Sequence, residues 1–231
     1  MSIPIILMGE SGTGKSRSVK TFPDGTVEVI NVMGKMLPFF EPKVQQVNVP
    51  ALAKEHGNAL KVDIVRSWLA NHTEHRAVVV DDAGYLITEM FMRWTVGDEK
   101  MSDQYGVYKE IASRMWNLFQ RVIEDGEADR IIYFVFHEET DQSGKVDLLT
   151  VGKLLNEKIK IRGLVTCTFQ SAKVGDQYGF HTNNGNPAKS PEGLFDEEFI
   201  DNDLYMVDSR IREAYGIKPL EAVKSDEKKE K

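Results

Sequence analysis

A short apolar run followed by a glycine-rich loop decides how this chain is interpreted. The stretch reads Ile3-Pro4-Ile5-Ile6-Leu7-Met8-Gly9-Glu10-Ser11-Gly12-Thr13-Gly14-Lys15-Ser16. Its last eight residues fit the phosphate-loop pattern G-x-x-x-x-G-K-[ST] at every fixed position. The pattern has meaning only between a strand and a helix, and the sequence predicts a strand over residues 3–8 and a helix over residues 15–21.

The spacing of this loop has a chemical reason. Glycines let the backbone curl so that several N–H groups point inward, and the following helix presents its N-terminus to the same place. We therefore expect the backbone of residues 9–16 to surround the phosphates of ATP. Lys15 is expected to reach the β- and γ-phosphates, and the Ser16 hydroxyl to bind Mg²⁺. The chain has no N-K-x-D sequence of the kind that guanine-specific switch GTPases carry.

Two carboxylates follow the apolar run of residues 77–80. A carboxylate at the tip of a buried strand beside the phosphate loop is suited to hold Mg²⁺, so Asp81 is predicted to share the metal with Ser16. Asp82 has two interpretations that the sequence leaves open. It could polarise the attacking water, or it could cap a helix that begins near Ala83.

His137 ends a second apolar run, residues 131–136. At that place it could sense the γ-phosphate or orient water, and the alternative is an ordinary surface histidine. The other four histidines show no spacing typical of a metal site, so no zinc is expected.

Strands that are apolar on both faces and alternate with helices indicate an α/β protein with a mostly parallel sheet flanked by helices. An antiparallel hairpin is predicted near the C-terminal end, from residues 164–171 and 177–182 with a turn at 173–176. One domain is expected over residues 1–220, followed by a charged, flexible tail over 221–231. Further strands are predicted over 26–32, 44–49 and 77–80, and further helices over 58–71, 85–95 and 105–124.

Composition narrows the class of protein. The 231 residues are 41% hydrophobic and 28% charged, as in a folded globular protein. The single cysteine, Cys167, excludes a disulfide within the chain and is interpreted as a core residue. No apolar stretch approaches the ~20 residues of a membrane span, so we expect no membrane contact and a cytoplasmic location. The formal net charge of −7 disfavours nucleic acid on average, but a local basic patch or an assembly could still bind it.

With residues 175–208 added to the phosphate loop, the chain resembles the phage-encoded AAA-like ATP-binding proteins with a RecA-type core. That group includes single-strand annealing proteins of phage recombination. The resemblance implies a RecA-like P-loop fold, a host cytoplasmic location and an oligomer with ATP near subunit interfaces. The segments that carry it are Gly34-Lys35, Leu37-Pro38-Phe39, Asp81-Asp82, His137-Glu138, Thr150-Val151-Gly152-Lys153 and Ala188-Lys189-Ser190-Pro191.

The resemblance also implies a basic side chain that a neighbouring subunit inserts into the nucleotide site, as an arginine finger does. Lys189 is the best candidate because it lies in a loop rich in Gly, Asn and Pro. Its alternative is an exposed lysine without a role in the reaction. The weaker candidates are Arg162, Arg210 and Arg212.

The chain departs from the RecA pattern at one point. RecA-type enzymes place an activating glutamate after the second core strand, but here Met33, Gly34 and Lys35 follow it and Asn31 is the nearest polar candidate. Asp82 could replace the glutamate, Glu10 could contribute, or hydrolysis could be slow.

Three roles follow from these residues. The first is ATP-dependent recombination or annealing on single-stranded DNA, with DNA or a single-strand-binding protein as partner. The second is a nucleotide-dependent switch or assembly factor with a protein partner, and the third is a phosphotransferase, for which no acceptor pocket is evident. The six acids of residues 192–203 should face away from DNA. Candidate DNA contacts are Lys100, Lys109, Arg114, Arg121 and Lys173 with Tyr105, Tyr108 and Tyr178.

Overall fold

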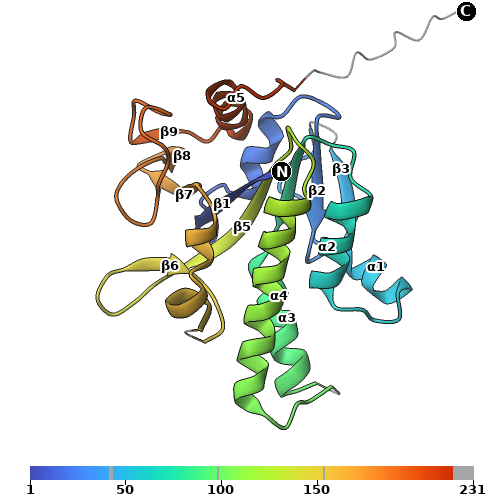
Figure 1. Cartoon of the computed structure of the whole chain (residues 1–231). Coiled ribbons are helices and arrows are strands. Elements are labelled where there is room, and N and C mark those ends of the chain that lie inside the picture. The colour runs from blue at the N-terminus through green and yellow to red at the C-terminus, as the bar shows by residue number, and fades with distance from the viewer. Residues whose placement is uncertain (42–43, 98, 153, 221–231) are drawn as a thin grey trace, which may run out of the picture.

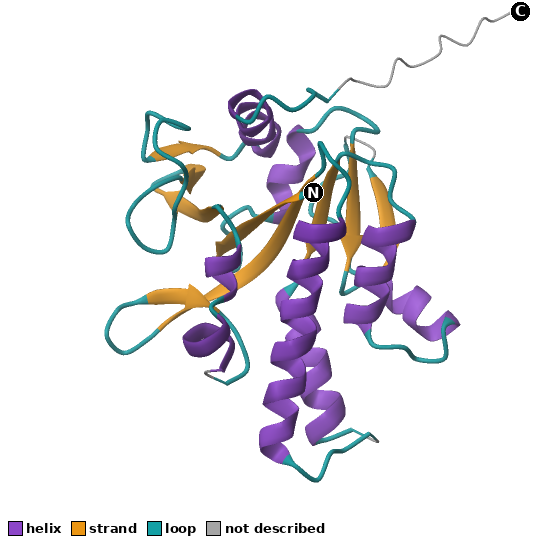
Figure 2. Cartoon of the chain, in the orientation of Figure 1, coloured by secondary structure: helices purple, strands orange, loops and turns teal. Residues whose placement is uncertain are grey.

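Nine strands of the described part of the chain form a mixed, mostly parallel sheet at the centre of the protein (Figures 1 and 2). The computed structural model describes residues 1–41, 44–97, 99–152 and 154–220, so the expected tail at 221–231 lies outside the described residues. The strands are β1 (Ile3–Gly9), β2 (Val27–Asn31), β3 (Gln45–Asn48), β4 (Ala77–Asp81), β5 (Ile131–Thr140), β6 (Val146–Leu148), β7 (Cys167–Val174), β8 (Gln177–His181) and β9 (Phe199–Asp201). The order across the sheet is β3-β2-β4-β5-β1-β7-β8-β9, with β6 paired to β5.

Helices cover both faces of this sheet because its central strands are apolar on both faces. Ile6 and Phe134 pack into the core beneath α1–α4, whereas Ile5 and Tyr133 face the second core, which η1 and α5 cover. The helices are α1 (Val49–Glu55), α2 (Lys61–Asn71), α3 (Gly84–Thr95), α4 (Gln104–Asp125) and α5 (Leu204–Ala214), with the 3₁₀ turns η1 (Ser16–Thr21) and η3 (Ile161–Leu164) and the π-helical η2 (Leu154–Ile159). None of the described helices is long and apolar enough to cross a membrane.

The parallel strands bring several polar strand ends to one edge of the sheet. In the pairing of β1 with β5, Gly9 lies opposite His137, and in the pairing of β2 with β4, Asn31 lies opposite Asp81. β7 also runs parallel to β1, with Gln170 opposite Met8. The phosphate loop therefore begins at the edge where β2 and β4 end, while β5 and β7 continue past it on either side of β1.

The predicted α/β architecture is confirmed, and so is the antiparallel hairpin, which is formed by β7 and β8. Its turn is shorter than predicted, because β7 continues to Val174. The sequence predicts one strand over residues 44–49, whereas in the structure β3 ends at Asn48 and α1 begins at Val49. The side-chain oxygen of Asn48 accepts a hydrogen bond from the Ala51 N–H and so caps the helix. Pro50 suits the first turn of a helix.

The predicted helix after the phosphate loop is a 3₁₀ helix of six residues. The Ser18 and Thr21 hydroxyls each donate to the carbonyl three residues earlier, at 2.6 and 2.9 Å, and Pro23 follows shortly afterwards. Such side-chain bonds compete with a regular α-helix. A helix this short adds little dipole at its N-terminus, so the loop itself has to provide the anion site.

Candidate functional site

Two glycines of the phosphate loop are required by its geometry. Gly14 has φ +97°, in the region that favours glycine, and a side chain there would lie 3.1 Å from the Asn202 Oδ1. At Gly9, a Cβ would lie 2.5 Å from the carbonyl oxygen of Ser171. The loop is thus packed closely against β7 and the segment after β9, which leaves its inner side to face the cavity.

Lys15 lies at the centre of the loop with 6% of its surface exposed. Its ammonium donates to the carbonyl oxygens of Gly9 at 2.8 Å and Glu10 at 2.6 Å. Burial lowers the pKa of Lys15, and the nearby carboxylates of Glu138, Asp82 and others oppose this shift. A buried ammonium surrounded by oxygen atoms is placed to exchange carbonyl partners for phosphate oxygens.

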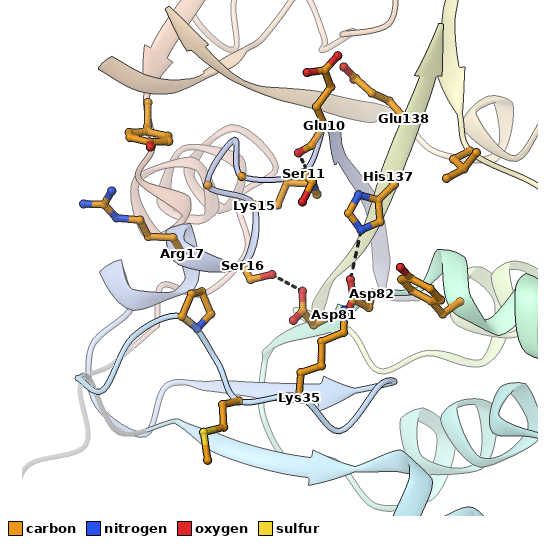
Figure 3. A pocket seen from close by; sticks show the side chains of 17 residues that line it. Glu10, Ser11, Lys15, Ser16, Arg17, Lys35, Asp81, Asp82, His137 and Glu138 are labelled. Atoms are coloured by element: carbon orange, nitrogen blue, oxygen red, sulfur yellow. Dashed lines mark hydrogen bonds and ion pairs between the residues drawn. The ribbon is translucent and has the colours of Figure 1, made fainter. Parts of the chain in front are cut away.

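Ser16 and Asp81, 65 positions apart in the chain, are joined by a hydrogen bond of 2.7 Å from the Ser16 hydroxyl to the Asp81 Oδ1 (Figure 3). Burial raises the pKa of Asp81 to about 6, although the bond from Ser16 favours the charged form. A hydroxyl and a carboxylate at this distance are the oxygen ligands that Mg²⁺ prefers. The residues present therefore fit the predicted metal, which would also stabilise the carboxylate charge.

Asp82 does not cap the following helix. The N-cap of α3 is Ala83, without a hydrogen bond from a side chain. The backbone of Asp82 has φ +60°, and its carboxylate lies 2.7 Å from the Lys35 ammonium and 3.6 Å from the His137 Nε2. The structure thus turns Asp82 into the cavity, as its predicted role with water requires, and that role stays a prediction.

His137 and Glu138 point to opposite sides of β5, because successive side chains alternate along a strand (Figure 3). Burial lowers the pKa of His137, which favours the neutral imidazole, and its ring meets Tyr85 edge to face with centroids 6.1 Å apart. Glu138 lies on the side of Glu10 and accepts from the Gln170 amide at 3.0 Å. Burial raises the pKa of Glu138.

These groups line one cavity of about 720 Å³. Asp82, His137 and Lys35 lie on one side of the phosphate loop, and Arg17 lies on the other (Figure 3). The cavity therefore has two chemically different ends. The residues lining it include the loop residues Glu10, Ser11, Gly12, Gly14, Lys15 and Ser16, and also Arg17, Lys35, Met36, Pro38, Asp81, Asp82, Tyr85, His137, Glu138, Leu149 and Tyr178.

The β7–β8 hairpin forms a wall of this cavity. The Ser171 hydroxyl on β7 donates to the Thr13 carbonyl at 2.7 Å, and Tyr178 on β8 lines the space beyond the loop. The hairpin, which the sequence predicts only as an addition to the sheet, is thus connected directly to the phosphate loop.

Lys189, the predicted finger residue, lies outside this cavity. The described residues that line the cavity do not include it, and its ammonium donates to the Val165 carbonyl at 2.6 Å. Its backbone pairs with Thr168 at the edge of β7. Burial and the charge of Arg162 lower the pKa of Lys189. Insertion into a neighbour's site would require Lys189 to leave this position, and its role as a finger stays a prediction.

The weaker candidates differ in how strongly they are held. Arg162 is 2.9 Å from the Asp147 carboxylate, and Arg210 is a half-exposed side chain 3.6 Å from Glu213. Arg212 is buried against Asp208 and also donates to the backbone carbonyls of three other residues, so its role is to anchor α5 to the sheet.

The sequence does not indicate that Lys35, Arg17 or Tyr178 lines the nucleotide cavity, and it offers Tyr178 only as a candidate DNA contact. For Lys35 a signal was present, because it follows a predicted parallel strand whose end must lie at the same edge as Asp81. The RecA pattern places an activating glutamate at this position, whereas this chain has a lysine. Tyr178 gave no comparable signal, since the sequence does not show where a hairpin packs.

A scan against models of protein families and a search of curated proteins found no match to this chain. The function therefore has to be inferred from the residues and the geometry of the cavity.

The first prediction concerns Asp81 and pH. Because burial raises its pKa from 3.8 to about 6, Asp81 stabilises the fold fully below about pH 4, and this contribution is lost as the pH rises through 6. Asp81→Asn removes the cost of burying the charge. The free energy of unfolding of the variant, relative to that of the unaltered protein, should therefore increase by about 2–3 kcal/mol as the pH rises from about 4 to 7.

Denaturant unfolding of both proteins across this pH range, without nucleotide or Mg²⁺, measures the difference. The control is Asp176→Asn in the exposed hairpin turn, which should show a difference near zero at every pH. A difference between Asp81→Asn and the unaltered protein that does not change with pH would contradict the prediction.

Proposed function

We propose that this protein binds Mg²⁺-ATP at the phosphate loop and hydrolyses it slowly, as a P-loop ATPase of the RecA-like type. The observation that carries the proposal is the hydrogen bond between Ser16 and Asp81. It unites the last residue of the phosphate-loop motif with the predicted metal-binding carboxylate, within 2.7 Å and in a cavity that also contains the buried Lys15.

Each group of the loop has a defined task in this proposal. The backbone of residues 9–16 surrounds the phosphates, and Lys15 transfers its hydrogen bonds from carbonyl oxygens to the β- and γ-phosphates. Ser16 and Asp81 hold Mg²⁺, which neutralises charge on the phosphate oxygens when it is bound. The negative charge of Glu138 favours the charged form of the Lys15 ammonium.

Asp82 is the proposed acceptor of the proton from water. The water oxygen forms a bond to the γ-phosphorus, the bond from that phosphorus to the bridging oxygen breaks, and ADP leaves with the electron pair. The proton passes to the Asp82 carboxylate, while the neutral His137 orients the water. Lys35 has to leave Asp82 before water can occupy the same oxygen, and this supports slow turnover.

Two hypotheses describe the biological role. The resemblance supports recombination or annealing on single-stranded DNA by an oligomer. The second hypothesis is a nucleotide-dependent switch or assembly factor with a protein partner, and one observation supports it. Several of the candidate DNA contacts are engaged within the chain: Arg114 with Asp63 and Glu110, Arg121 with Asp125, Lys173 with Asp176, and Lys109 with the Tyr105 ring.

The second prediction tests nucleotide binding. Lys15→Ala should weaken Mg²⁺-ATP binding by about 100-fold, because it removes a buried charge that the phosphates require. Isothermal titration measures the affinity. Lys20→Ala, an exposed lysine of the same short helix, is the matched control and should bind as the unaltered protein does. ATP binding of Lys15→Ala at the unaltered affinity would refute the proposed function.

The third prediction concerns turnover. Asp82→Asn should lower single-turnover hydrolysis at least about 100-fold while ATP still binds, because the proton acceptor is lost. Lys35→Met should raise hydrolysis about fivefold, since it removes a half-exposed ion pair worth roughly 1 kcal/mol that holds Asp82. Phosphate release at saturating ATP measures both. Unchanged hydrolysis in Asp82→Asn would exclude Asp82 as the acceptor.

The fourth prediction separates the two roles. Filter binding of single-stranded DNA, across salt and with ATP, ADP or neither, is combined with light scattering to measure size. For the switch, we expect the size to change with ATP and no DNA to be retained even at low salt. Retention of DNA that depends on ATP and falls with salt would establish the first role instead.

A further inference from the structure

The cavity continues past the phosphate loop to a cationic and aromatic end. There the Arg17 guanidinium lies 5.2 Å from the centre of the Tyr178 ring, and the Lys173 ammonium lies 5.3 Å from the same centre. Arg17 and Tyr178 both line the cavity. The groups that act on water and on the terminal phosphate in the proposed function lie at the other end, around Asp82 and His137 (Figure 3).

The two ends give the cavity a direction. A terminal phosphate has to face Asp82 and His137, since a water molecule can be oriented there. Lys15 and Ser16 occupy the middle, where they face the phosphates and Mg²⁺. A molecule with a chain of phosphates bound in this direction extends its remaining part toward Arg17, the residue that follows Ser16.

We propose that Tyr178 and Arg17 form the binding site for the nucleoside part of the nucleotide, an inference that rests on the proposed function. A base stacks on an aromatic ring or on a guanidinium plane through its π-face. Because every base has such a face, the site selects for a nucleoside triphosphate but distinguishes weakly between adenine and guanine. ATP and GTP are therefore both ligands, with affinities within a few fold of each other.

Tyr178 is held in place relative to the phosphate loop. β8 pairs with β7, whose Ser171 hydroxyl donates to the Thr13 carbonyl at 2.7 Å. The carbonyl of Tyr178 accepts from the N–H of Asn202, and the Asn202 side chain lies against Gly14. The strand that carries the ring is therefore connected to the loop at Thr13 and Gly14, and a base on the ring would be in a constant position relative to the phosphates.

The experiment compares three ligands, Mg²⁺-ATP, Mg²⁺-GTP and Mg²⁺-tripolyphosphate, which has the phosphates without a nucleoside. Tyr178→Leu keeps a bulky apolar side chain in the strand but removes the ring, whereas Tyr178→Phe keeps the ring. We expect Tyr178→Leu to lose about 10-fold in affinity for ATP and for GTP and to bind tripolyphosphate as before. Tyr178→Phe should bind all three ligands within about threefold of the unaltered protein.

Two outcomes overturn the nucleoside site while leaving the proposed function intact. In the first, Tyr178→Leu binds ATP as well as the unaltered protein does. In the second, its affinity for tripolyphosphate falls in parallel with that for ATP, which indicates a disturbed loop. A failure of the proposed function looks different, because the unaltered protein would then bind neither ATP nor tripolyphosphate, and this result overturns both proposals.

Discussion

The arrangement of this protein depends on the position of β1, which is paired in parallel on both sides and buried along nearly its whole length. Because β5 pairs with one side of β1 and β7 with the other, the C-terminal end of β1 lies between two neighbouring strands. The phosphate loop that follows therefore lies between β5 and β7, which both continue past the end of β1, and near the end of β4. Asp81, His137, Glu138 and the β7–β8 hairpin meet the loop for this reason, although they come from distant parts of the chain.

Burial gives the charged groups of this cavity a common property. It lowers the pKa of Lys15 and His137 and raises that of Asp81 and Glu138, so each group is shifted toward its neutral form. The hydrogen bonds from Ser16 to Asp81 and from Gln170 to Glu138 offset part of this cost. A polyphosphate with a divalent cation would bring charges of both signs, and the same groups would then be stabilised in their charged forms. The electrostatic properties of the cavity thus favour an ionic ligand.

The hairpin changes how the architecture relates to function. As a sequence feature it is an antiparallel addition to a parallel sheet. In the folded protein its first strand contacts the phosphate loop and its second strand carries Tyr178 into the cavity. In our proposal the parallel core thus provides the groups for phosphate and metal, whereas the hairpin provides the surface on which the nucleoside lies.

The α/β class and the hairpin could be predicted from the sequence alone, and both predictions are confirmed. The sequence also selected Lys15, Ser16, Asp81 and His137, which the fold brings to one cavity, while their roles stay predictions. The information behind these assignments is local, because the phosphate loop is one continuous motif and Asp81 and His137 each follow an apolar run. Where the signal was weak, prediction failed. The three-residue strands β6 and β9 show too little periodicity to recognise, and α1 begins inside a run that resembles a strand.

Which side chains face one another depends on the tertiary fold. The contact of Lys35 with Asp82 and the approach of Arg17 to Tyr178 each join segments that are distant along the chain. The same is true of Lys189, which the fold holds against Val165. Such contacts depend on the order of the strands across the sheet and on where the hairpin packs. Burial of the whole apolar core determines both, and no single sequence motif does.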